Sequence, residues 1–136
     1  MGAWGVLAFD NDDACDWAYG LKRVGDLSLV VSAFAAVVGG AEYLDAHEAS
    51  NALAACEVLA RLRGKPGYSN PYTECVDAWV ASHQIDPPTS ILARAEEVID
   101  RVLGDNSELR GLWDDSEAMG PEWRRSVEEL RQRLRM

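Results

Sequence analysis

Residues 1–17 read MGAWGVLAFDNDDACDW and combine two glycines, two tryptophans and four aspartates in a short stretch. Small and bulky side chains mix over residues 1–9, so we expect an irregular N-terminal lead-in. Asp10 is predicted to be the N-cap of the first helix, because its carboxylate can accept hydrogen bonds from the free N–H groups of the first turn. Asp13, three residues later, completes a capping-box pattern. The rest of the chain is expected to supply the helices on which this lead-in docks.

Apolar spacing and capping residues predict helices along most of the chain. The predicted helices cover residues 11–22, 27–38, 46–63, 71–82, 88–103, 107–115 and 122–135. The segment 27–38 is apolar almost all round, which predicts a central buried helix, although its valines leave a strand as the alternative. The sequence therefore predicts an all-α, orthogonal helical bundle of six to seven helices, with residues 1–136 forming a single domain.

The net charge, apolar runs and cysteines of the sequence exclude some classes of partner and location. The 136 residues carry a formal net charge of -10, which repels phosphate groups and argues against nucleic acids and anionic membranes as partners. The longest apolar run, residues 29–38, is too short to span a bilayer. Three cysteines without CxxC spacing indicate free thiols and a cytoplasmic protein. The predominance of arginine over lysine suggests a bacterial source.

Carboxylates are the candidates for a divalent-cation site, because hard cations prefer oxygen ligands. The candidate metal ligands are Asp10, Asp12, Asp13, Glu48 and Glu57. The aspartates do not have EF-hand spacing, and the favoured interpretation is that they cap the helix and complement its dipole. The two glutamates are nine residues apart and lie on roughly opposite sides of a helix, which argues against a shared site. No other cofactor is expected.

Glu57 has two interpretations, because it lies within an alanine-rich helix. A buried Glu57 would have a raised pKa and could act as a ligand or a general acid. The favoured alternative is an ordinary i,i+4 pair with Arg61, which contributes tenths of a kcal/mol. His47-Glu48 resembles the start of an HExxH zinc motif, but Asn51 occupies the position of the second histidine, so that motif is absent.

Trp4, Asp16 and Trp17 are the candidate binding residues. The two tryptophans are expected to pin the lead-in onto the helical core, since aromatic side chains bury large apolar areas. The sequence contains no GxSxG, GxGxxG or GxxxxGK[ST] motif. No catalytic residue is therefore predicted, and nucleotide binding has no support.

The opening Met-Gly-x-Trp-Gly, followed by residues 9–14 and by Asp16-Trp17, resembles the start of the family called domain of unknown function 4259. The similarity continues within residues 43–57 and 101–113. The resemblance implies a free-standing bacterial protein with a native N-terminus. It brings no assigned activity and no catalytic residues.

Size and charge favour a small acidic cytoplasmic protein that binds another protein. An immunity- or inhibitor-like role toward a basic partner is the specific form of this prediction. One alternative is an enzyme that uses a carboxylate-bound divalent metal. The other is a structural accessory protein that forms homo-oligomers.

Overall fold

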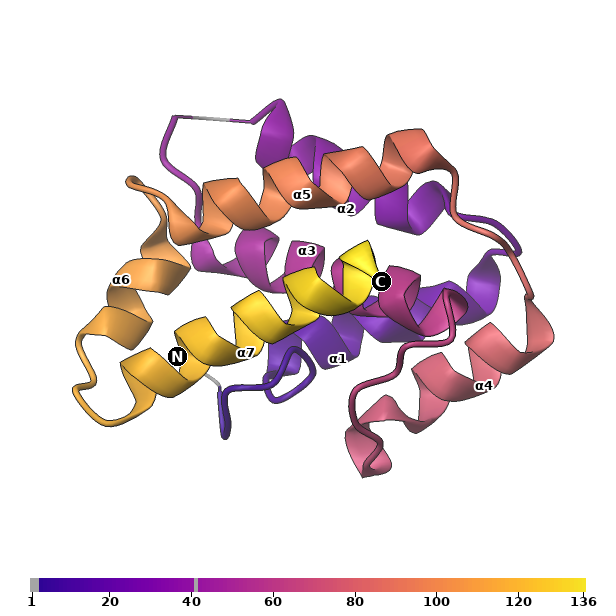
Figure 1. Ribbon diagram of the computed structural model, residues 1–136, viewed down its shortest axis with the longest axis horizontal. Helices are drawn as coiled ribbons and strands as arrows, with labels where there is room; N and C mark the ends of the chain where they lie inside the picture. Colours follow the sequence, from indigo (N-terminus) through magenta and orange to yellow (C-terminus); the bar gives the residue numbers. More distant parts are fainter. Residues whose placement is uncertain (1–2, 41) are drawn as a thin grey trace.

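The computed structural model describes residues 3–40 and 42–136, which form an all-α helical bundle (Figure 1). The elements are α1 (Asp12–Tyr19), the 3₁₀ helix η1 (Gly20–Arg23), α2 (Ser28–Val38), α3 (Ala46–Leu62), the 3₁₀ helix η2 (Pro71–Thr73), α4 (Glu74–Ser82), α5 (Thr89–Leu103), α6 (Glu108–Asp114) and α7 (Met119–Arg135). Within the described ranges no β-strand forms. The predicted fold class is confirmed.

Helix α3 is the centre of the bundle, and it contacts α1, α2, α4, α5, α6 and α7. In the view of Figure 1, α2 and α5 lie on one side of α3, and α1 and α7 lie on the other. The helix begins as predicted, because the Asp45 carboxylate accepts a 2.8 Å hydrogen bond from the Glu48 N–H. Every residue from Ala52 to Arg61 is buried. Alanines in this stretch allow neighbouring helices to approach closely.

Helix α2 confirms the helical prediction for this segment, and the strand alternative is wrong. Its predicted central position is also wrong. Val30, Phe34 and Val37 pack toward the core, but Val31 is 47% exposed on the opposite face. The helix packs mainly on α3 and α5, because the alanine-rich α3 occupies the centre of the bundle.

The start of α1 differs from the prediction by one residue. Asn11, rather than Asp10, is the N-cap, and its side chain accepts a 2.8 Å hydrogen bond from the Ala14 N–H. The Asp10 carboxylate is turned back toward the lead-in, where it accepts a 3.1 Å hydrogen bond from the Leu7 N–H. Asparagine and aspartate are equally good caps, so the contact within the lead-in decides between them.

Helix α7 begins at Met119, earlier than the predicted start at Glu122. The Ser116 hydroxyl accepts a 3.1 Å hydrogen bond from the Met119 N–H. Pro121 lies in the first turn, where a helix does not need the N–H that proline lacks. None of the helices in the described parts of the chain is long and apolar enough to cross a membrane.

Candidate functional site

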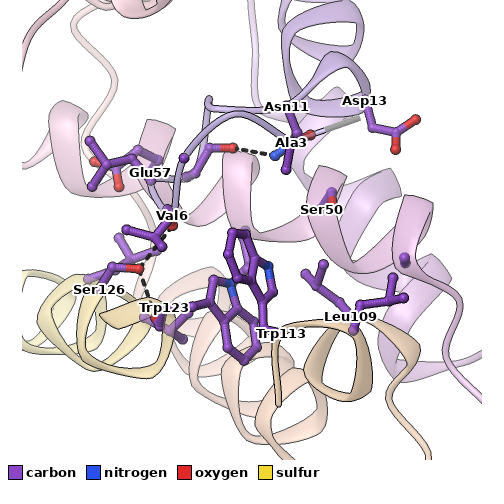
Figure 2. A pocket seen from close by; sticks show the side chains of 18 of the residues that line it. Ala3, Val6, Asn11, Asp13, Ser50, Glu57, Leu109, Trp113, Trp123 and Ser126 are labelled. Atoms are coloured by element: carbon purple, nitrogen blue, oxygen red, sulfur yellow. Dashed lines mark hydrogen bonds between the residues drawn. The ribbon is translucent and has the colours of Figure 1, made fainter. Parts of the chain in front are cut away.

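The lead-in, residues 3–10, is a loop held against the bundle. Phe9 is completely buried, and the Trp4 N–H donates a 2.9 Å hydrogen bond to the Asp10 carbonyl. On α7, the Ser126 hydroxyl donates a 3.1 Å hydrogen bond to the Val6 carbonyl (Figure 2). The lead-in is therefore fixed at its own turn and at α7.

A cavity of about 360 Å³ lies between this lead-in and helices α1, α3, α6 and α7. Ser50, Leu53 and Glu57 line it from α3, because their spacing of three and four residues places them on one face of the helix. Figure 2 shows the indole rings of Trp113 and Trp123 side by side within the lining. Their centroids are 6.3 Å apart and their planes differ by 9°. The cavity thus has aromatic and aliphatic walls.

One part of the cavity wall is a buried ion pair. Glu57 is 1% exposed and accepts two hydrogen bonds from Arg133, of 2.6 Å to Nη1 and 2.9 Å to Nη2. The Nε of Arg61 lies 3.6 Å from the same carboxylate. The expected contact with Arg61 is therefore present, but the pair is buried and Arg133 is the closer partner. A bidentate pair of this kind is strong and directional.

Arg133 is held from several sides. Its Nε donates a 2.6 Å hydrogen bond to Glu129, and its Nη1 also donates to the Lys65 carbonyl at 3.0 Å. Burial lowers the pKa of Arg133, but the hydrogen bonds to Glu57 and Glu129 outweigh burial and leave the pKa raised. The guanidinium is therefore charged at every ordinary pH.

A second group of charged residues lines the cavity near the first turns of α1, α3 and α6. His47 is largely exposed, and its Nδ1 lies 2.8 Å from Asp13 Oδ2. This hydrogen bond, followed by the charge of Asp13, raises the pKa of His47. Glu108 accepts a 2.7 Å hydrogen bond from the Ala46 N–H and so joins the starts of α3 and α6. Asp12, which is exposed, completes the group.

Tyr68 also lines the cavity, and its hydroxyl is buried beside the Phe9 backbone. Burial raises the pKa of this phenol, and the nearby charge of Glu57 adds to the effect. This oxygen has almost no accessible surface, so Tyr68 contributes to the wall of the cavity without offering an open hydrogen-bonding group.

The model of the family described as domain of unknown function (DUF4259) matches residues 2–126. The chain belongs to this family. No curated protein matches the chain, and no solved structure matches it. The resemblance noted in the sequence is confirmed, and the match stops before the second half of α7, which carries Arg133 of this DUF4259 protein.

The candidate metal ligands are divided by the fold. Asp12, Asp13 and Glu57 line the cavity, whereas Asp10 is engaged with the lead-in and Glu48 lies outside the lining. Over residues 3–40 and 42–136, no three His, Cys, Asp or Glu side chains are grouped so that they could hold a metal ion. The five carboxylates are not brought together, and a divalent-cation site stays a prediction.

The candidate binding residues Trp4, Asp16 and Trp17 do not form one site. The Trp4 side chain is 48% exposed, and its ring lies 4.9 Å from that of Tyr72 in η2. Trp17 is partly buried against the core, whereas Trp4 is one of the exposed large hydrophobic residues, so the expected docking of Trp4 on the core is wrong. Asp16 is exposed, and neither Asp16 nor Trp17 lines the cavity.

Sequence reasoning missed several cavity residues of this DUF4259 protein. Trp113, Trp123 and Arg133 line the cavity but are not among the site residues predicted from the sequence. The helical spacing of Trp123, Ser126, Leu130 and Arg133 is a weak signal of a shared face. That signal does not show that the face borders a cavity.

Proposed function

We propose that this DUF4259 protein binds a small molecule in the cavity between the lead-in, α1, α3, α6 and α7. The observation that carries this proposal is the combination of a partly open cavity of about 360 Å³ with aromatic walls and a few fixed polar groups. Ligand sites are typically concave, about 300–1,000 Å³ in volume, mostly apolar and supplied with a small number of polar groups. The volume of this cavity falls within that range.

The walls support such binding because they are already ordered. The buried Glu57–Arg133 pair fixes α3 against α7, and the stacked Trp113 and Trp123 fix α6 against α7. The lead-in closes a further side through the Ser126 hydrogen bond. A preformed site loses little free energy in ordering when a ligand enters.

The experiment uses 2-phenylethanol, a small neutral aromatic molecule, as the probe. Titration is followed by tryptophan fluorescence and by the melting temperature, which rises when a ligand binds the native state alone. We expect saturable binding to one site. The variant Ser50→Leu, whose new side chain projects from α3 into the cavity, is expected to lose this binding.

Two further variants control for surface effects and for misfolding. Ser32→Leu adds the same side chain to the exposed face of α2 and is expected to bind as the wild type does. Ala8→Leu fills the cavity from the lead-in and is expected to repeat the loss if Ser50→Leu unfolds the protein. Equal binding by the filled and unfilled variants, with retained helical circular dichroism, would overturn the proposal.

Binding to a basic protein is a second candidate function. It is favoured by the exposed aromatic pair of Trp4 and Tyr72, each 48% exposed, on a chain of net charge -10. Aromatic residues are enriched at protein interfaces. A Trp4→Ser, Tyr72→Ser variant is expected to lose a partner recovered by cross-linking, whereas Ser50→Leu is expected to keep it. If the double variant keeps the partner and Ser50→Leu loses it, the partner does not bind at the Trp4 and Tyr72 surface.

A further inference from the structure

We infer that the ligand of the cavity is a small cationic amphiphile, in which an ammonium group is attached to an aromatic or aliphatic body. This inference rests on the proposed function, since it assigns the chemical class of the molecule that the cavity accepts. It is carried by the charges that line the cavity, by the occupied backbone donors beside them and by the position of the apolar wall.

The charged groups of the lining divide into two sets. In the first set, Arg133 is paired with Glu57 and Glu129, and Glu57 also lies beside Arg61. These carboxylates are therefore already matched by guanidinium groups. Little charge in this set is left to attract a ligand.

The second set is left with an excess of negative charge. It contains Asp12, Asp13 and Glu108 against His47 alone. The helix starts that meet there each contribute about half a positive charge, which does not cancel three carboxylates. An ammonium group is therefore attracted to this end of the cavity, and a carboxylate or phosphate is repelled.

Some of the backbone donors at these helix starts are also occupied. Asn11 accepts from the Ala14 N–H, and Asp45 accepts from the Glu48 N–H. Glu108 itself accepts from the Ala46 N–H. These three N–H groups already have a carboxylate or amide acceptor and are not open to an anion. The usual attraction of anions to helix N-termini is therefore reduced at the starts of α1 and α3.

The carboxylates keep acceptor capacity for a cation. A carboxylate can accept about four hydrogen bonds, whereas the hydrogen bonds above use one oxygen of Asp13 and one of Glu108. An ammonium group offers several N–H donors that can meet the remaining lone pairs. Leu109, Leu53 and Trp113 supply the apolar part of the same lining, so an attached ring or chain is removed from water.

The test compares three probes of similar shape: 2-phenylethylamine, 2-phenylethanol and 3-phenylpropionate, which are cationic, neutral and anionic at neutral pH. Isothermal titration at low ionic strength gives the Kd of each, because salt screens exposed charges. We expect the amine to bind about tenfold more tightly than the alcohol, the scale of one charge-assisted hydrogen bond. The carboxylate is expected to bind most weakly.

Variants identify the groups responsible for the preference. Glu108→Gln keeps an acceptor for the Ala46 N–H but removes the charge, and Asp13→Asn removes a second charge. Each is expected to weaken amine binding severalfold while leaving alcohol binding unchanged. Asp16→Asn, on the same helix as Asp13 but outside the lining, is the matched control and is expected to change neither.

The outcomes separate the two proposals. Equal binding of the amine and the alcohol, or tighter binding of 3-phenylpropionate, would overturn the cationic class and leave the cavity as a binding site. A Glu108→Gln variant with undiminished amine preference would also overturn the charge assignment. If none of the three probes binds, both proposals fail.

Discussion

Glu57 is the residue whose removal most clearly tests the interior of the protein. Its carboxylate is 1% exposed and holds Arg133 by two hydrogen bonds. Glu57→Gln leaves two guanidinium groups without this counter-charge, and breaking a buried pair from one side typically costs about 3–5 kcal/mol. We expect a loss of this size in the free energy of unfolding, measured with urea. Glu97→Gln on the exposed face of α5 should change stability little.

The double variant Glu57→Met, Arg133→Met distinguishes a charge effect from a packing effect. Replacing both members of a buried pair with apolar side chains is often close to neutral. The double variant is therefore expected to be more stable than the sum of the two single changes predicts. Strict additivity would show that the two residues do not act as a pair.

At the residue scale, His47 makes the stability of the folded protein depend on pH. Its hydrogen bond to Asp13 raises the pKa of the imidazole in the folded state. The stabilisation is therefore fully present below the unfolded pKa, about 6.5, and is lost as the pH rises through the folded pKa. NMR titration should show that Asp13→Asn lowers the pKa of His47. An unchanged pKa in the variant would contradict the pairing.

At the scale of elements, the lead-in depends on a close approach between Gly5 and Asp10. A Cβ at residue 5 would lie 2.3 Å from Asp10 Oδ2, which accepts the Leu7 N–H. We expect Gly5→Ala to destabilise the protein by about 1–3 kcal/mol, as overpacking usually does. Hydrogen exchange should show earlier opening of residues 3–10 than in the wild type.

Gly111 in α6 is the matched control for this substitution. A Cβ there meets no atom within 4 Å, and alanine is the better helix former by about 0.8–1.0 kcal/mol. Gly111→Ala is therefore expected to stabilise the protein. Equal effects of the two substitutions would show that the Gly5 contact has no special role.

Element boundaries were predictable where the capping signal is local. Asp45 caps α3, and Gly64 follows its end with a positive φ of 77°, a conformation that favours glycine. The start of α1 was misassigned because Asp10 and Asn11 are equally suitable caps. The contact that turns Asp10 toward Leu7 belongs to the lead-in, whose shape has no regular sequence pattern.

At the scale of the whole molecule, the helical class follows from apolar spacing, but the neighbours of each helix do not. Arg133 is 76 residues from Glu57, and nothing in either local sequence indicates the partner. Likewise, the apolar segment 27–38 suggested a central helix, whereas the alanine-rich α3 occupies that position. The candidate site was beyond sequence reasoning for the same reason, since a cavity is defined by side chains from distant segments.

The most direct test of ligand binding in this cavity is an NMR titration of the indole N–H signals with 2-phenylethanol. The signals of Trp113 and Trp123, which line the cavity, are expected to shift with one common Kd and to show intermolecular contacts to the probe ring. Trp79, whose Nε1 donates to the Val24 carbonyl away from the cavity, should not shift. A probe that binds while the signals of Trp113 and Trp123 stay unchanged would contradict the account.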